Sequence, residues 1–201
     1  MSFKKNNYAV IRNAISKEVA DFIYQYFLLK REVARFYFNN KIISPFERKW
    51  GNWSDAQIPD TYSNYSDVVM ETLLPKIQPM MEKKIGLKLN PAYTYARIYK
   101  RGDILKRHKD RFSCEISTTM NLGGDGWPIY LEPSGKKGMK GIEVNLKPGD
   151  MLAYRGCDVE HWRKKFTGKN CGQVFLHYND QSTLGSKENK FDKRPMLGVL
   201  I

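Results

Sequence analysis

The sequence predicts a mainly β fold, either a sandwich or a barrel, with supporting helices supplied by its N-terminal half. Helical spacing of apolar residues is confined to the first 91 of the 201 residues. From about residue 92 to residue 180, short runs rich in β-branched and aromatic residues alternate with turn sequences and leave no room for helices between them. We expect a single domain, with helical support in 1–91, a β core in 92–180 and a polar, surface-exposed tail in 181–201.

The first predicted elements are a short strand and a helix. Residues 8–11 have the apolar, β-branched character of a strand. Ser16 has the side chain of a helix N-cap, and Glu18 lies in the first turn, where a carboxylate suits the helix dipole. The apolar positions that follow recur at helical spacing and predict the buried face: Val19, Phe22, Ile23, Tyr26 and Phe27.

A second helix is expected to be capped by Ser66 and to carry the apolar residues Val69, Leu73, Ile77 and Met81. Pro75 and Pro79 lie within it. Because proline lacks an N–H group and clashes with the preceding turn, we expect a kink or break in the second half of this helix. Residues 40–65, between the two helices, contain Trp, Gly, Pro and several small polar residues. They predict a long irregular segment, which is a candidate lid.

The C-terminal half is expected to contain six strands, at residues 93–99, 114–122, 129–131, 142–146, 151–154 and 172–178. Turn sequences separate them, including Gly-Gly-Asp-Gly at 123–126 and Pro-Gly-Asp at 148–150. Many closely spaced strands of this kind pack as a sandwich or close into a barrel.

Composition limits the classes of function. The net charge of +13 favours an acidic partner such as nucleic acid. The basic residues are spread along the chain, however, which favours the simpler explanation that these charges only keep the protein soluble. Cys114, Cys157 and Cys171 are far apart and form no CxxC pair, as expected of free thiols in a reducing compartment. The sequence contains neither an apolar run long enough to cross a membrane nor a signal-peptide pattern, so we expect a cytoplasmic location.

The chain has only three histidines, and two of them combine with an aspartate into a candidate metal site. On an extended chain, His108 and Asp110 point to the same side because they are two residues apart. His161 follows a turn-and-return sequence that can bring it beside them. Two histidines and one carboxylate on one face of iron leave three coordination positions open. Taken alone, His-x-Asp is equally well explained by a surface histidine among Lys106, Arg107, Lys109 and Arg111.

The run from residue 97 to residue 110 resembles the prolyl 4-hydroxylase-like branch of the 2-oxoglutarate oxygenases. That family often reads Tyr-x-x-Gly-x-x-(Tyr or Leu)-x-x-His-x-Asp, and this chain has Tyr99, Gly102, Leu105, His108 and Asp110. The Lys-Pro-Gly-Asp run at 147–150 and the later histidine also fit, so the resemblance covers roughly residues 66–178.

The resemblance implies a double-stranded β-helix (jelly roll) with N-terminal helices packed against one sheet. It implies His108, Asp110 and His161 as both the catalytic residues and the ligands of Fe(II). It also implies 2-oxoglutarate and O2 as co-substrates, with succinate and CO2 as products and hydroxylation of an unactivated carbon. Whether ascorbate is needed stays open.

The sequence departs from the family where the distal carboxylate of 2-oxoglutarate should find a cation. The family commonly places Arg or Lys nine or ten residues after the second histidine, but here these positions are Asn170 and Cys171. Arg163 shares strand parity with His161 and could grip a carboxylate in bidentate fashion. Lys169 and then Lys165 are the other candidates, and all three could instead be solvated.

Four further side chains near the motifs have simpler structural explanations beside the functional ones. Tyr99 and Thr119 are candidate co-substrate contacts, although a half-buried strand would also carry such residues. His177 is as plausible in a structural or outer-shell role as in the pocket. Trp127 is expected in the core.

Three functions are compatible with these observations. The first is a hydroxylase of a protein or peptide side chain, with proline as the residue that the family favours. The second is an oxidative demethylase or hydroxylase of nucleic acid, suggested by the charge. The third is a non-catalytic jelly-roll module, suggested by the missing cation.

Overall fold

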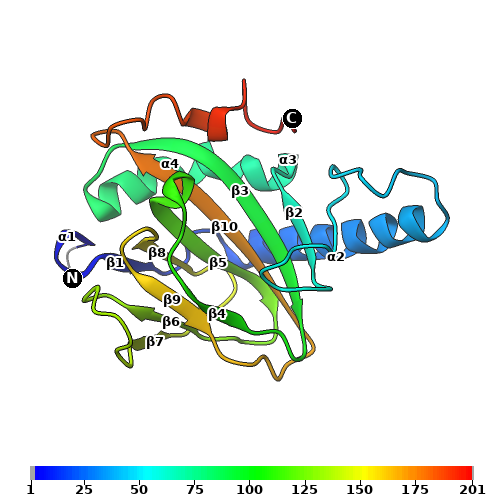
Figure 1. The fold of residues 1–201 in the computed structure, drawn as a ribbon, viewed down its shortest axis with the longest axis horizontal. Helices are drawn as coiled ribbons and strands as arrows, with labels where there is room; N and C mark the ends of the chain where they lie inside the picture. Colours follow the sequence, from blue (N-terminus) through cyan, green and yellow to red (C-terminus); the bar gives the residue numbers. More distant parts are fainter. Residues whose placement is uncertain (1–2, 201) are drawn as a thin grey trace.

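Two antiparallel sheets form the centre of the computed structural model, which describes residues 3–200 (Figure 1). The strands are β1 (Tyr8–Ile11), β2 (Tyr62–Tyr65), β3 (Leu89–Lys100), β4 (Leu105–His108), β5 (Ile116–Gly124), β6 (Ile129–Glu132), β7 (Ile142–Val144), β8 (Met151–Arg155), β9 (Glu160–Arg163) and β10 (Asn170–Asp180). The larger sheet has the order β1-β8-β5-β10-β3-β2, and the smaller has the order β4-β9-β6-β7.

From β3 to β10, successive strands alternate between the two sheets, except that β6 and β7 both belong to the smaller sheet. All the pairings are antiparallel. This is the jelly-roll arrangement, so the mainly β fold with N-terminal helices is confirmed. The strand predicted at Tyr8–Ile11 is β1, and each of the six predicted C-terminal segments overlaps a strand.

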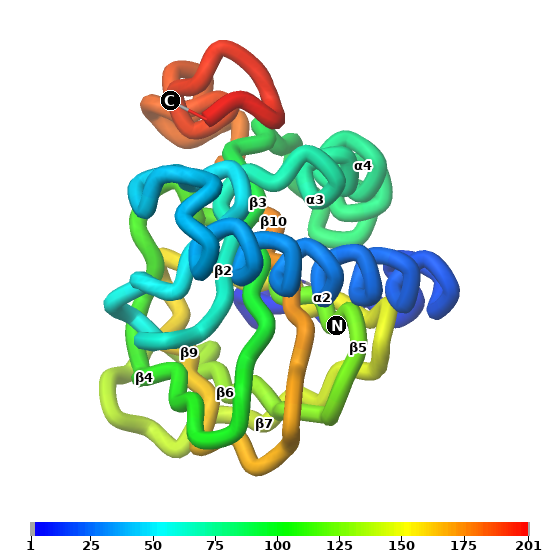
Figure 2. The backbone as a smooth tube through the Cα atoms, turned by 90° about the vertical axis from the view of Figure 1, so that its right-hand side faces the viewer, coloured from blue at the N-terminus to red at the C-terminus, as the bar shows by residue number. Residues whose placement is uncertain are grey.

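The α-helices of the described residues all come before β3 in the chain. They are α1 (Phe3–Asn6), α2 (Lys17–Asn39), α3 (Val68–Glu71) and α4 (Leu73–Ile85). Figure 2 shows α2 lying across the strands of the larger sheet, with α4 beside it. Their buried residues share one apolar core with that sheet, in which Phe27 and Ile77 pack with Met120 and Val174. Within residues 3–200, no helix has both the length and the apolar character required to cross a bilayer.

The buried face of α2 is rotated from the face that the sequence predicted. Phe22 and Val19 are 72% and 40% exposed, whereas Ala20, Tyr24 and Ala34 are buried together with Ile23 and Phe27. The reason lies in the sheet, where Gly123 and Gly172 leave room for the ring of Tyr24. A Cβ atom at either glycine would lie within 2.7 Å of that ring. The helix therefore docks through Tyr24, a contact that apolar periodicity alone does not encode.

Ser16 caps α2 as predicted, accepting a hydrogen bond from the Val19 backbone N–H at 3.3 Å. Replacing Ser16 with alanine is expected to lower the free energy of unfolding by about 1 kcal/mol, because one N–H group of the first turn loses its acceptor. Urea denaturation measures this loss. Lys17→Ala, at the next exposed position, is the matched control and should change stability by less than about 0.5 kcal/mol. An equal loss in both variants would contradict the capping role.

The second predicted helix is divided and begins one residue later than expected. Asp67, not Ser66, caps α3 by accepting a hydrogen bond from Met70 N at 3.0 Å. The chain breaks at Thr72, and α4 follows. Pro75 explains the place of the break, since it has no N–H group to donate to the carbonyl of Glu71. The break was expected in the second half of the helix but occurs earlier, near its start, and Pro79 is tolerated inside α4.

Two parts of the chain are more ordered than the sequence suggested. The segment predicted to be irregular ends in β2, which pairs with β3 at the edge of the larger sheet. The tail after β10 was expected to be a surface loop, but Ser186, Asn189 and Arg194 are buried in it. Arg194 forms an ion pair of 2.7 Å with the buried carboxylate of Glu71. This pair ties the tail to α3 and so to the body of the fold.

Candidate metal centre

Two strands of the smaller sheet bring the two predicted histidine ligands together. β4 pairs with β9, and His108 lies directly opposite His161 in the register of that pair. The centroids of their rings are 4.2 Å apart. Residues separated by 53 positions in the sequence are therefore cross-strand neighbours.

Asp110 completes the cluster from the loop that follows β4. Its backbone N–H donates to the Gly156 carbonyl at 2.9 Å, which fixes the course of that loop. Its Oδ1 atom lies 3.6 Å from His108 Nε2 and 3.4 Å from His161 Nε2. One ligand atom from each of the three residues lies within 4.8 Å of the others. The predicted His-Asp-His set thus converges as a single metal ion requires.

Hydrogen bonds on the side away from the cluster fix the orientation of the three candidate ligands. His108 Nδ1 lies 2.7 Å from the Lys106 carbonyl, and His161 Nδ1 lies 3.1 Å from the Val159 carbonyl. A carbonyl only accepts hydrogen bonds, so each Nδ1 carries the hydrogen and each Nε2 turns its lone pair toward Asp110. Ser117 Oγ donates to Asp110 Oδ2 at 2.6 Å, which leaves Oδ1 for a metal.

Charges at the cluster favour a cation. Burial alone would raise the pKa of Asp110, but the imidazoles of His108 and His161 beside its carboxylate outweigh burial and hold that pKa well below the usual range. Burial lowers the pKa of the third histidine, His177, to about 4, so this imidazole is neutral at pH 7. Its Nδ1 lies 3.1 Å from Ser117 Oγ. His177 therefore supports Asp110 through Ser117 and lies outside the metal cluster.

Gly156 leaves the space that the Asp110 carboxylate and its neighbours fill. A Cβ atom there would lie 2.5 Å from Asp110 Oδ2, 2.2 Å from the Cys114 carbonyl and 2.8 Å from Ser117 Oγ. Gly156→Ala is therefore expected to displace the carboxylate and weaken Mn(II) binding by about 10- to 100-fold, as loss of an outer-shell partner does.

Isothermal titration with Mn(II) measures the effect of Gly156→Ala. Gly126→Ala is the control, since a Cβ atom at Gly126 meets nothing within 4 Å. Unchanged Mn(II) affinity in the Gly156 variant would mean that the carboxylate is not confined in this way.

The metal cluster lies in the wall of a cavity of about 340 Å³. Aromatic rings make up much of the remaining wall, from Tyr93, Tyr95, Tyr99, Tyr154 and Phe175. The segment predicted as a candidate lid contributes Asp55 and Gln57. Asp55 bonds to the buried guanidinium of Arg97 and to the Tyr95 hydroxyl, and Gln57 Nε2 lies 3.2 Å from His108 Nε2. This segment thus reaches the metal-facing side of the cluster.

Arg163 is a buried cation on the strand that carries His161. It is 1% exposed and follows His161 by two positions on β9. Its guanidinium donates to the Trp127 carbonyl, to Thr119 Oγ1 at 3.1 Å and to Gln173 Oε1 at 3.3 Å. All three acceptors are neutral, and the buried Nε has no partner among the described residues. A buried positive charge without an acid is costly to the fold and is typical of an anion site.

The other predicted co-substrate residues divide into two groups. Tyr99 is 1% exposed, lines the cavity and packs edge-on against Trp127, with ring centroids 4.7 Å apart. Thr119 donates to Gln173 Oε1 at 2.9 Å and belongs to the Arg163 cluster. Lys169 is exposed and precedes β10 in the turn after β9, which makes it a weaker candidate than the buried Arg163. Lys165 is exposed in the same turn.

Several residues of the site were not identified from the sequence. Ser117 had a detectable signal, since it shares strand parity with Thr119 on β5. Asp55 and Gln57 had none, because an irregular segment does not reveal which strand it will cross. Arg97 lies on the predicted strand 93–99, but its partner Asp55 comes from that irregular segment.

Comparisons with known proteins agree at the level of fold. No protein-family model matches the sequence, and no curated protein matches it significantly. A prolyl-4-hydroxylase from Pseudomonas putida superimposes with a TM-score of 0.59 at 11% identity, over 90% of this chain and 96% of that one.

Two further solved structures are similar. A prolyl hydroxylase from Trichoplax adhaerens, in complex with a hypoxia-inducible-factor peptide fragment, has a TM-score of 0.57 at 13% identity, over 89% of this chain and 86% of that one. HygX from Streptomyces hygroscopicus, with nickel, 2-oxoglutarate and hygromycin B bound, has a TM-score of 0.58 at 14% identity, over 90% and 85%. These likenesses show that the chain shares the fold of 2-oxoglutarate-dependent non-haem iron enzymes.

Proposed function

We propose that this chain is an Fe(II)- and 2-oxoglutarate-dependent dioxygenase that hydroxylates a side chain of a protein or peptide. The observation that carries the proposal is the pairing of two features on β9. His161 belongs to the His-Asp-His cluster that lines the cavity, and Arg163 places an unpaired cation two positions further along the same strand. Fold neighbours with the same chemistry support it.

The residues present fit iron. Two imidazole nitrogens and one carboxylate oxygen form the donor set of non-haem Fe(II) oxygenases and leave open positions for co-substrates. When bound, iron with 2-oxoglutarate supplies the activation of dioxygen that oxidises a C–H bond, with succinate and CO2 as co-products. The protein holds the three ligand atoms in place through the Lys106 and Val159 carbonyls and Ser117.

Arg163 is suited to bind the distal carboxylate of 2-oxoglutarate. A strand advances about 3.3 Å per residue, so residue 163 lies about 7 Å from residue 161 along β9. Its guanidinium provides the charge and the planar pair of donors that a carboxylate prefers. Thr119 accepts a hydrogen bond from that guanidinium and donates its own hydrogen to Gln173 Oε1, so it orients the guanidinium. Tyr99 and Trp127 wall off this part of the molecule from water.

A protein or peptide is the substrate class that we favour. Two of the solved fold neighbours reported above are prolyl hydroxylases, one of them with a bound peptide. The cavity is bordered by an irregular segment whose Asp55 and Gln57 reach over the metal cluster, an arrangement that suits a flexible chain entering from outside. Nucleic acid is the second candidate, favoured by the net charge of +13.

Succinate formation tests the proposal. Purified protein is incubated with Fe(II), 2-oxoglutarate, O2 and ascorbate, first alone and then with proline-containing peptide libraries and single-stranded RNA or DNA. We expect peptide-stimulated succinate and a 16 Da gain in the peptide. Stimulation by nucleic acid only would favour the second candidate. Absence of succinate, together with absence of 2-oxoglutarate binding to the Mn(II)-loaded protein, would overturn the enzymatic proposal.

A further inference from the structure

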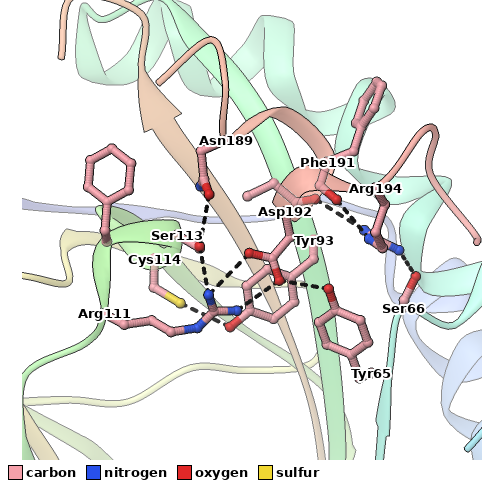
Figure 3. A network of polar contacts seen from close by, with 12 residues as sticks. Tyr65, Ser66, Tyr93, Arg111, Ser113, Cys114, Asn189, Phe191, Asp192 and Arg194 are labelled. Carbon is pink, nitrogen blue, oxygen red and sulfur yellow. Dashed lines mark hydrogen bonds and ion pairs between the residues drawn. The ribbon is translucent and has the colours of Figure 1, made fainter. Parts of the chain in front are cut away.

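The tail after β10 reaches back to the loop that carries the metal-binding aspartate. Asp192, in the short helix η2 (Lys190–Lys193), forms a two-point ion pair with Arg111 (Figure 3). Arg111 Nη1 lies 3.1 Å from Asp192 Oδ1, and Nη2 lies 2.8 Å from Oδ2. Arg111 is the residue next to Asp110. A carboxylate 81 positions further along the chain therefore holds the neighbour of a metal ligand.

Other side chains brace this ion pair. The Tyr65 hydroxyl, from β2, donates to Asp192 Oδ2 at 2.7 Å. Arg111 Nη1 donates to Ser113 Oγ at 2.7 Å, and Ser113 Oγ donates to Asn189 Oδ1 at 3.3 Å (Figure 3). β2, the 109–115 loop and the tail thus meet at one point. Such a braced pair holds its geometry better than an exposed pair does.

Arg111 also forms part of the cavity. Its guanidinium lies 4.9 Å from the centroid of the Tyr93 ring, and both residues line the cavity that contains the metal cluster. The ring of Tyr93 packs in turn on His177, with centroids 4.6 Å apart. A shift of Arg111 would therefore change both the cavity wall and the position of Asp110.

The tail adopts an unusual backbone to present Asp192. Phe191, Asp192 and Lys193 have φ angles of 57°, 57° and 65°, which are left-handed values in three consecutive residues other than glycine. Such residues cost about 1–2 kcal/mol each and persist where the surrounding structure over-determines them, often at functional sites. Here the buried Arg194–Glu71 ion pair fixes one end, and the hydrogen bond of 2.8 Å between Asn189 and Asn179 fixes the other.

We propose that Asp192 is a positioning residue for the metal centre, acting through Arg111 on the loop that carries Asp110. The inference rests on the proposed function in one respect, namely that the His-Asp-His cluster binds a metal. Asp110 is also held by Gly156 and Ser117, so losing Asp192 loosens the cluster without removing a ligand. We expect a loss of metal affinity of roughly 3- to 10-fold, less than for an outer-shell partner that bonds a ligand directly, because Asp192 contacts Arg111 and not Asp110.

Co(II) binding to the full chain tests this inference, since the visible spectrum of Co(II) reports ligand geometry without any turnover. Asp192→Asn keeps the shape of the side chain but removes its charge. We expect a larger dissociation constant for Co(II), by the same factor, and a changed Co(II) absorption spectrum. Glu188→Gln is the matched control, because it removes one charge from an exposed residue of the same tail. It should bind Co(II) with the affinity of the wild type.

A double-mutant cycle separates positioning from general destabilisation. In an Arg111→Gln background, Asp192→Asn should cause no further loss of Co(II) affinity, because its effect passes through Arg111. An equal loss in both backgrounds, or a wild-type affinity and spectrum in Asp192→Asn alone, would overturn the inference. If the wild-type protein itself binds no Co(II), the proposed metal centre fails and the inference falls with it.

Discussion

Replacing His161 with alanine is expected to abolish 2-oxoglutarate turnover and to weaken Fe(II) or Mn(II) binding by more than about 100-fold. Even outer-shell residues change metal affinity by about 10- to 100-fold, and this change removes a ligand itself. The remaining pair, His108 and Asp110, comes from one short stretch of chain, so the cation would no longer be held from both strands. Metal titration and succinate formation measure the two losses.

His177 provides the matched control for this experiment. It is buried in the same cavity but is separated from the cluster by Ser117, so His177→Ala should keep a measurable Mn(II) site, weakened by about 10-fold at most. Circular dichroism checks that both variants are folded. If the His177 variant lost the metal while the His161 variant kept it, the assignment of the ligands would be wrong.

Replacing Arg163 with leucine is expected to weaken 2-oxoglutarate binding by roughly 100- to 3,000-fold, because a carboxylate buried without its cation is disfavoured by about 3–5 kcal/mol. The same change should leave the melting temperature nearly unaltered. It removes three hydrogen bonds to neutral acceptors, but it also removes a buried charge that has no acid partner among the described residues. Calorimetric titration of 2-oxoglutarate into Mn(II)-loaded protein measures the affinity.

Lys169→Met tests the competing assignment in the same assay. Lys169 is exposed in the turn before β10, so its removal should change 2-oxoglutarate affinity by less than about twofold, as expected of an exposed, screened charge. A larger loss in this variant than in the Arg163 variant would show that the turn closes over the co-substrate and that the buried guanidinium has another role.

The convergence of His108, Asp110 and His161 could be predicted from the sequence because its signal is largely local. His108 and Asp110 share a side of an extended chain whatever the rest of the molecule does, and a Pro-Gly-Asp turn before His161 indicates a returning strand. The same parity argument placed Arg163 on the side of His161. For Lys169 the argument was parity with Gln173 and His177 on one strand, but β10 begins at Asn170, so Lys169 lies just before that strand.

The features that the sequence did not reveal depend on contacts between distant parts of the chain. The docking face of α2 is set by the space at Gly123 and Gly172, which lie on strands far along the sequence. The ion pair between Arg111 and Asp192 joins two residues that each look like ordinary surface charges. Periodicity reports which side of an element is apolar, and it carries no information about which neighbour that side will meet.

The strand order of the larger sheet has a consequence for how the molecule is made. β10 lies between β3 and β5, so these two strands have no hydrogen-bonded partner on their facing sides until residues 170–180 arrive. During synthesis the ribosome therefore releases two unpaired edges, which are prone to aggregation, well before the strand that joins them. We expect folding to be slow and to occur after translation of β10, with nascent chains that depend on chaperones up to that moment.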